Sequence, residues 1–220
     1  MSIEANAGHA GNSFSPMLIS DADFQRMVTF IKSNYGIDLS HKRQLITGRL
    51  SPTIRKMGYS SFSDFVTHLL EKKDADEITM ILNKLTTNYT FFMREQEHLE
   101  YFRQRIIPDL IRRHQRDKVL SIWSAGCSSG EEPYNITMYL FDYLGTQARQ
   151  WDTGILATDI SANALTSAKK GIYELPETMP TDWKRKYFTK NPDGTYTVVP
   201  SVRDNVIFQT FNLMNPINFR

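Results

Sequence analysis

The residues with the clearest chemical potential lie in the segment Ile122–Glu132, which has the sequence IWSAGCSSGEE. A β-rich run ends at Ser124, and a turn containing Gly126 and Gly130 follows. A helix is predicted to begin at Glu131. Glycine in such a turn allows unusual backbone angles and lets a ligand approach the backbone closely, while amides at the helix start favour polar ligand groups. The loop residues expected at a nucleoside-containing cofactor are Ala125, Gly126 and Cys127.

An acid belongs to the same pattern. The run GILAT at 154–158 predicts a second buried strand, which ends at Asp159. A carboxylate there can accept both ribose hydroxyls of a nucleoside, which argues against a glycine loop that merely connects two elements. Dinucleotide sites prefer the spacing G-x-G-x-x-G, whereas Ser128 occupies the second glycine position here. The acids Glu131 and Glu132 would repel a pyrophosphate, so charge and spacing favour S-adenosylmethionine, a sulfonium cation, over a dinucleotide.

Cys127 is the single cysteine of the chain. Transfer of a methyl group from a sulfonium is a direct displacement, so no covalent intermediate is needed and Cys127 is not expected to act as a nucleophile. The histidines show no metal-ligand spacing, and we predict no metal site. One cysteine excludes an internal disulfide and fits a reducing cytoplasm.

Hydrophobic periodicity predicts the elements that must position these residues. Residues 1–20 are rich in Ser, Ala, Gly and Asn and predict a disordered tail. Residues 21–85 carry apolar residues at helical spacing and predict an all-helical domain with short turns. Gly36 is expected to end its first helix, and Ser40 is a candidate cap for its second. Residues 86–117 predict a linker and an amphipathic helix.

From residue 118 onward the order of elements changes. Strands are expected at Lys118–Ser124 and 154–158, each followed by a helix, which predicts a parallel α/β sheet. Further along, the turn NPDG at 191–194 separates short alternating runs that predict a small antiparallel β-subdomain over about 187–210. The expected fold class is α/β, with a Rossmann-like domain over 118–220 that follows the helical domain.

The bulk composition is that of an ordinary globular protein. The 220 residues are 40% hydrophobic and 23% charged, with a formal net charge of +2, so the whole molecule is not an obvious nucleic-acid binder. The longest apolar runs are too short to cross a bilayer, and the first twenty residues lack the basic start and apolar core of a signal peptide. We therefore expect a cytoplasmic protein without direct membrane insertion, and a monomer because no large apolar seam is indicated.

Several motifs resemble the CheR family of chemotaxis receptor methyltransferases. They are LTTNYTFFMRE at 85–95, WSAGCSSGEEPY at 123–134 and ATDIS at 157–161. Further similarity covers the helical stretch that contains GIDLSHKRQLITGRL at 36–50, and YF…VIF…FNL at 187–213. The resemblance extends from about residue 21 to the end of the sequence, with its motifs in the family order.

The resemblance implies a two-domain enzyme. An all-helical receptor-docking domain would precede a class I methyltransferase (Rossmann-like) domain with a small β-subdomain. Such an enzyme transfers a methyl group from S-adenosylmethionine to glutamate side chains of chemotaxis receptors (methyl-accepting chemotaxis proteins), in their cytoplasmic domains. The products would be glutamate methyl esters, used in sensory adaptation, and S-adenosylhomocysteine.

The resemblance also implies residue roles. The cofactor-binding residues that it suggests are Asn88, Thr90, Arg94, Glu131, Asp159, Asn212 and Leu213. Glu131 is expected at the methionine end and Asp159 at the ribose, whereas the last two would lie beside the adenine. Arg94 could hold the acceptor carboxylate or the cofactor's carboxylate by a bidentate contact and is the candidate catalytic, positioning residue. A surface ion pair of Arg94 with Glu95 or Glu97 is the alternative.

The segment 40–56, SHKRQLITGRLSPTIRK, contains no acid. Leu45, Ile46 and Leu50 would face the core and leave a basic outer face. A solvated face is the default interpretation, but in the family that the chain resembles a basic N-terminal helix docks on acidic receptor helices. The candidate docking residues are Lys42, Arg43, Arg49, Arg55 and Lys56.

Two other functions stay open at this point. One is a class I methyltransferase acting on nucleic acid or a small molecule, although segment 40–56 lacks the interleaved aromatic residues of nucleic-acid surfaces. The other is a non-catalytic module that binds S-adenosylmethionine or receptors. Members of the family that the chain resembles continue past FNL with a CRN-type motif, an IYF segment and further strands. This sequence ends at Arg220, so the C-terminal part of the domain is expected to be missing.

Overall fold

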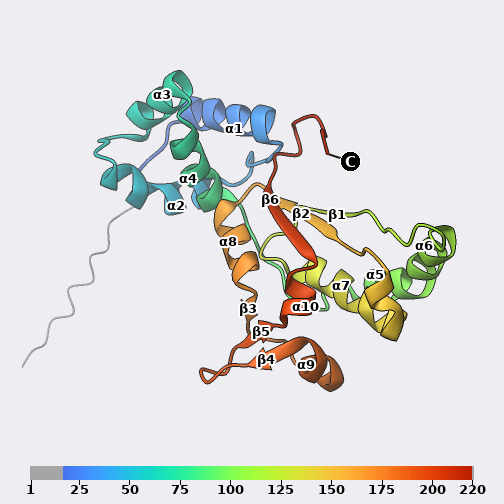
Figure 1. Cartoon of the computed structure of the whole chain (residues 1–220). Helices are drawn as coiled ribbons and strands as arrows, with labels where there is room; N and C mark the ends of the chain where they lie inside the picture. The colour runs from blue at the N-terminus through green and yellow to red at the C-terminus, as the bar shows by residue number, and fades with distance from the viewer. Residues whose placement is uncertain (1–16, 220) are drawn as a thin grey trace, which may run out of the picture. The chain divides into compact units, whose positions relative to one another are not determined.

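The computed structural model describes residues 17–219 and divides the chain into two compact units, Met1–Leu85 and Thr86–Arg220 (Figure 1). The tail predicted over 1–20 lies outside the described residues as far as residue 16. The expectation of disorder is wrong for residues 17–20. The Met17 amide donates a hydrogen bond to Ser51 Oγ at 3.0 Å, and Ile19 is buried in the helical core.

The first unit is built from helices that share one apolar core, as predicted (Figure 1). Their bounds are α1 Asp21–Tyr35, α2 Arg43–Lys56, α3 Phe62–Lys72 and α4 Ala75–Leu85. Polar caps fix where two of them begin: the Ser20 hydroxyl accepts a hydrogen bond from the Asp23 amide of α1, and the Ser61 hydroxyl accepts one from the Asp64 amide of α3. Gly36, with a φ of 69°, ends α1, which confirms the predicted stop.

The candidate cap at Ser40 is wrong. The residue preceding α2 is Lys42, which makes no capping hydrogen bond with its side chain. Ser40 instead donates from both its amide (3.0 Å) and its hydroxyl (2.7 Å) to Asp38 Oδ1. The aspartate two residues earlier captures these donors in a local turn, so the hydroxyl is already engaged before the helix begins.

The amphipathic helix predicted around 95–115 is present with a change of winding. Its parts are α5 Gln96–Tyr101, the π-helical turn η1 Phe102–Ile106 and α6 Ile107–Arg113. Pro108 follows η1 and has no amide hydrogen, so it cannot close an ordinary turn with the carbonyl four residues earlier. The wider π turn ends at Ile106, two residues before this proline, where such a break in the ladder is expected.

The second unit contains a parallel sheet in the order β1-β2-β6. The strands are β1 Ile122–Ala125, β2 Ile155–Asp159 and β6 Val206–Thr210. The helices α7 Glu131–Leu144 and α8 Ala162–Lys170 contact this sheet, and the short 3₁₀ helix η2 Gly145–Gln150 follows α7. The strand predicted from Lys118 begins later, because Lys118 has a left-handed φ of 53° and Val119 forms only an isolated bridge with Asp152.

A small antiparallel sheet in the order β3-β5-β4 accompanies it. Its strands are β3 Ile172–Tyr173, β4 Phe188–Lys190 and β5 Tyr196–Val198, and the neighbouring helices are α9 Thr181–Tyr187 and α10 Pro200–Arg203. The predicted β-subdomain over 187–210 is wrong in its last part, because 206–210 pairs with β2 in the parallel sheet. The Asn205 side chain donates to the Thr153 carbonyl at 2.9 Å and so aligns β6 beside β2.

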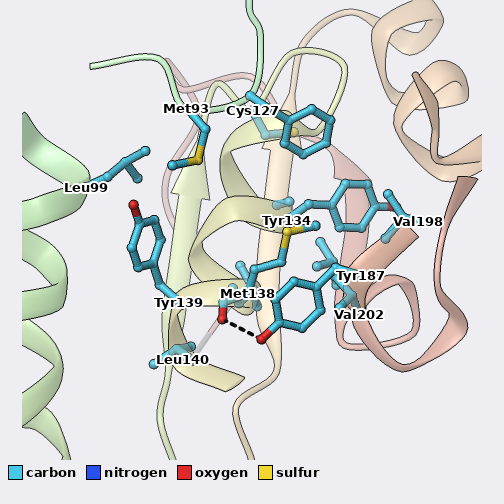
Figure 2. Close-up of a cluster of buried hydrophobic side chains, with 14 of the residues drawn as sticks. Met93, Leu99, Cys127, Tyr134, Met138, Tyr139, Leu140, Tyr187, Val198 and Val202 are labelled. Atoms are coloured by element: carbon cyan, nitrogen blue, oxygen red, sulfur yellow. Dashed lines mark hydrogen bonds between the residues drawn. The ribbon is translucent and has the colours of Figure 1, made fainter. Parts of the chain in front are cut away.

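Tyrosine hydroxyls tie α7 to the surrounding elements. Tyr134 is fully buried and donates to the Ala168 carbonyl on α8 at 2.8 Å. Tyr187 donates to the Met138 carbonyl at 3.2 Å, the dashed contact in Figure 2. These two hydrogen bonds hold α7 in place, and they thereby fix the position where the loop between β1 and α7 ends. Within residues 17–219, no helix has both the length and the apolar character required to span a membrane.

Candidate cofactor and active site

A cavity of about 370 Å³ lies in the second unit, beside the residues that follow β1 and end β2. Its wall comes from the segment before α5 and the start of that helix, from the loop at 126–128, from α7 and from Asp159. Ligands of open α/β sheets bind at the carboxyl ends of the strands, so this is the position expected for a cofactor. The cavity is therefore the candidate functional site.

A closed set of hydrogen bonds joins the three segments of the wall. Asp159 accepts from the Ser128 amide through Oδ2 and from the Ser161 amide through Oδ1, both at 2.8 Å. Asn88 donates from Nδ2 to Ser161 Oγ at 3.1 Å, and its carbonyl accepts from Ser128 Oγ at 3.2 Å. Each residue is thus held by two others, which fixes Asn88 and Asp159 before any ligand arrives.

The glycine loop packs closely against its neighbours within the protein. The amides of Gly126 and Cys127 both donate to the Thr158 carbonyl, at 2.8 and 2.9 Å. Gly130 has a φ of 95°, and a Cβ added there would lie 2.8 Å from Ala168 Cβ. Ser128 adopts a left-handed φ of 50° without being glycine. Such strain outside glycine is typical of functional loops that the surrounding structure over-determines.

Arg94 lines the cavity, and its side chain is about half exposed. Its Nη1 donates to the Tyr89 carbonyl at 2.9 Å, and its Nε lies 3.6 Å from Glu95 Oε1. The residues on either side, Met93 and Glu95, have left-handed φ angles of 63° and 53°. The pocket position and the ion pair with Glu95, which the sequence presents as alternatives, therefore occur together.

The two acids that open α7 have different surroundings. Glu131 is buried outside the cavity wall and accepts a hydrogen bond from Ser129 Oγ at 2.8 Å. Burial raises the pKa of the Glu131 carboxyl, and the hydrogen bond from Ser129 opposes that rise. Glu132 lies in the wall and accepts from Ser124 Oγ at 2.8 Å. The structure thus brings the second acid to the cavity, whereas the family resemblance pointed to the first.

Sequence reasoning missed Asn135 altogether. This side chain lines the cavity, is only 2% exposed, and its Oδ1 has no hydrogen-bond partner among the described residues. Asn135 follows Glu132 by three positions, so both lie on one face of α7. That helical spacing is the signal in the sequence that could have identified it.

The remaining predicted cofactor residues divide into two groups. Thr90, Gly126 and Cys127 belong to the cavity wall, whereas Ala125, Asn212 and Leu213 do not. Asn212 Oδ1 accepts from the Met214 amide at 3.0 Å, and Leu213 is 58% exposed. These two residues follow β6, on the far side of β2 from β1.

The Cys127 thiol is an inert part of the wall. It is 2% exposed, and burial, together with the nearby charge of Asp159, raises its pKa to about 12. The thiol is therefore protonated at neutral pH and is not a nucleophile there.

The basic residues of α2 in the first unit have unequal roles. Arg43 donates to the Ile19 carbonyl at 2.9 Å, pairs with Asp21, and lies 4.4 Å from the Phe24 ring centre. Arg49 donates to the Lys84 carbonyl at 3.0 Å. Both arginines thus support the packing of the unit. The exposed members of the predicted docking set are Lys42, Arg49, Arg55 and Lys56.

The wall fits a nucleoside cofactor with a positively charged tail. Asp159 ends β2, where a ribose is expected, and Glu132 and Asn135 add acceptor oxygens to the same wall. Fold and site together define a Rossmann-like nucleoside-binding protein. The chain belongs to the CheR methyltransferase family: the family's SAM-binding domain matches residues 88–219, and its all-alpha domain matches residues 22–86. S-Adenosylmethionine is therefore the methyl donor.

Named relatives agree with this assignment. The chain is 34% identical to the chemotaxis protein methyltransferase of Borreliella burgdorferi, over 90% of this chain and 71% of the relative. It is 36% identical to chemotaxis protein methyltransferase 2 of Pseudomonas aeruginosa, over 87% and 68% of the two chains. It is 34% identical to the chemotaxis protein methyltransferase of Escherichia coli, over 90% and 68%.

Proposed function

We propose that this enzyme transfers a methyl group from S-adenosylmethionine to glutamate side chains in the cytoplasmic domain of chemotaxis receptors. The observation that carries the proposal is the cavity, which places the Arg94 guanidinium in the same wall as Asp159 and the acceptors of α7. The names of the relatives supply the class of substrate. We further propose that the protein acts in the cytoplasm as a monomer, without nucleic acid or membrane insertion.

The chemistry requires alignment more than activation. A glutamate carboxyl has a reference pKa of about 4.3 and is ionised at neutral pH, so no general base is needed. A carboxylate oxygen of the acceptor forms the bond to the methyl carbon while the methyl–sulfur bond breaks. The electron pair of that bond stays on sulfur, which gives the ester and neutral S-adenosylhomocysteine. Holding the reactants in line is worth about 7–11 kcal/mol in favourable intramolecular cases.

Arg94 is the residue proposed to position the carboxylate. Guanidinium groups bind carboxylates through two parallel hydrogen bonds, which fix orientation as well as distance. The contacts to the Tyr89 carbonyl and to Glu95 hold the arginine in place on its own side. A preorganised donor of this kind aligns a carboxylate without a large reorganisation during the reaction.

The remaining wall residues are proposed to hold the cofactor. Asp159 would accept from the ribose hydroxyls with the lone pairs that its two amide contacts leave available. The loop at Gly126 and Cys127 would pack against the cofactor, and Asn88 and Thr90 would close the cavity from the segment before α5. The exposed basic residues of α2 are proposed to dock on acidic receptor helices.

The test is transfer of radiolabelled methyl to a receptor cytoplasmic fragment, scored as methanol released by base. A carboxyl methyl ester is base-labile, so volatile label that appears only with receptor and enzyme together supports the proposal. A receptor fragment with its acceptor glutamates replaced by alanine is the matched control and should accept no label. Base-stable label, or label on nucleic acid in place of the receptor, would overturn the assignment of substrate.

A further inference from the structure

A buried amide without a partner marks one point of the cavity wall. Asn135 lies in the second turn of α7 and is 2% exposed, yet its Oδ1 makes no hydrogen bond within residues 17–219. An unsatisfied buried acceptor destabilises a folded chain, so native structures nearly always pair such groups. Because Asn135 lines the cofactor cavity, a donor on a bound ligand would supply the missing partner.

The position of Asp159 indicates which half of the cofactor Asn135 meets. Asp159 ends the middle strand of the parallel sheet and is the expected contact of the ribose. The two halves of the cofactor extend from the ribose in opposite directions. The cavity wall contains the loop that follows β1, together with Arg94 and residues of α7, whereas the residues that follow β6 are not among those that line it. Asn135 therefore faces the methionine half.

Only one group in the methionine half of the cofactor can donate a hydrogen bond to Asn135 Oδ1. The methionine half of S-adenosylmethionine carries a carboxylate and a sulfonium, neither of which has a hydrogen to donate, and an α-ammonium, which has three. Glu132, three positions earlier on the same helix face, adds a carboxylate to the wall. An ammonium between a carboxylate and an amide carbonyl has its charge and two of its hydrogens satisfied.

We propose that Asn135 recognises the α-ammonium group of the cofactor through Oδ1 and makes the enzyme selective for ligands that carry this group. The inference rests on the proposed assignment of the cavity to S-adenosylmethionine. Asn135 is then a specificity-determining residue that contacts the cofactor and leaves the reacting atoms to other groups. Its unpaired state in the protein alone is the consequence of holding an acceptor ready for the ligand.

The test is a binding cycle with two ligands. S-Adenosylhomocysteine carries the α-ammonium, and its desamino analogue has hydrogen in its place. Calorimetric affinities for both are measured with the unaltered chain, with Asn135→Leu and with Thr137→Val. Thr137 is the matched control, because it is buried on the same helix, donates to the Pro133 carbonyl at 3.0 Å and lies outside the cavity wall.

We expect Asn135→Leu to weaken the binding of S-adenosylhomocysteine by about tenfold or more and to leave the affinity for the desamino analogue unchanged. A hydrogen bond to a charged group is lost with the first ligand only. Thr137→Val should not discriminate between the ligands. The ligand-free Asn135→Leu chain should melt at the same temperature as the unaltered chain or higher, because an unpaired polar atom has been removed. A purely structural role would lower both the melting temperature and both affinities.

A second variant keeps the test decisive if the leucine chain folds poorly. Asn135→Asp retains the acceptor and adds charge, so the preference for S-adenosylhomocysteine over the desamino analogue should increase. Equal losses for the two ligands in either variant, or no loss in Asn135→Leu, would overturn the inference while leaving the proposed function intact. Failure of the unaltered chain to bind either ligand would instead refute the assignment of the cavity.

Discussion

Asp159, at the end of β2, accepts a hydrogen bond from the backbone amide of Ser128 in the glycine loop, with 2.8 Å between Oδ2 and the nitrogen. The same carboxylate accepts from the Ser161 amide at the start of α8. One side chain therefore holds both the loop that follows β1 and the turn that follows β2. A change at this position is expected to affect ligand binding through charge and through the shape of the loop together.

Asp159→Asn should weaken binding of S-adenosylhomocysteine by about tenfold or more, because the neutral amide is a poorer acceptor for ribose hydroxyls and turns an N–H group toward one of its two amide partners. Isothermal titration calorimetry provides the measurement. Asp152→Asn is the matched control, since Asp152 also accepts a backbone amide, that of Gly154 at 3.1 Å, but at the opposite end of β2. Equal affinities for the two variants would contradict the role assigned to Asp159.

Arg94→Lys tests positioning of the carboxylate. Lysine keeps the charge but cannot form two parallel hydrogen bonds, so kcat/KM for methyl transfer should fall by about 10- to 100-fold. Arg103→Lys is the control, because Arg103 of η1 pairs with Glu100 of α5 and is not part of the cavity wall. Normal turnover with normal cofactor affinity in Arg94→Lys and Arg94→Ala would exclude Arg94 from catalysis.

Gly130→Ala should destabilise the second unit by about 2 kcal/mol or more. The added Cβ would lie 2.8 Å from Ala168 Cβ and 3.1 Å from the Tyr173 hydroxyl, and the φ of 95° is strained for alanine. Gly194→Ala carries the strain of a φ of 88° without a nearby atom, so its loss should be about 1 kcal/mol. Urea unfolding followed by tryptophan fluorescence is suitable, since Trp123, Trp151 and Trp183 all lie in this unit. Equal losses would mean that the contact with α8 is unimportant.

Local signals in the sequence predict much of this fold. The bounds of α7 at Glu131–Leu144 and the stop of α1 at Gly36 follow from glycines and acids that act within one turn of the chain. The partner of 206–210 does not follow, because an alternating strand has the same pattern in a parallel or an antiparallel pair. Contacts between Asn205 and Thr153, distant in sequence, decide that pairing.

The residues of the site also differ in whether local sequence signals or contacts distant in sequence determine their positions. Gly126 and Asp159 are predictable because their roles depend on position relative to a strand end. The choice between Glu131 and Glu132 depends on the rotation of α7 about its axis, which the buried Tyr134 fixes through its bond to the Ala168 carbonyl. Neighbouring residues on a helix differ by about 100° in direction, so the hydrophobic pattern must fix the rotation of α7 to better than that angle before it can tell the acid in the wall from the buried one.

The Cys127 thiol should be almost unreactive in the folded chain. With a pKa of about 12, the thiolate fraction at pH 8 is only about 1 in 10⁴, and it rises as the pH increases toward 12. Labelling by iodoacetamide at pH 8 should therefore be slow in buffer and become fast in 8 M urea, where the thiol returns to a pKa of about 8.5. Rapid labelling of the folded chain would show that Cys127 is exposed or activated.

The basic residues proposed for receptor docking differ in whether they are exposed surface charges or support the packing of the helical unit. Lys42, directly before α2, and Lys56, its last residue, are exposed, whereas Arg43 donates to the Ile19 carbonyl and pairs with Asp21. Lys42→Glu and Lys56→Glu should each weaken binding to an acidic receptor fragment by about threefold or more at low salt, with a smaller difference at high salt, because exposed charges act through a screened field.

The control is Lys72→Glu, the same change of charge on an exposed residue of α3. Arg43→Glu should lower the melting temperature of the helical unit, since it removes contacts to two residues that begin the unit. Surface plasmon resonance at two salt concentrations measures the affinity of each variant for the receptor fragment. Thermal melts measure the stability of the helical unit in Arg43→Glu. If Lys72→Glu weakens binding as much as the α2 variants, the receptor responds to the net charge of the unit, and α2 is not the docking helix.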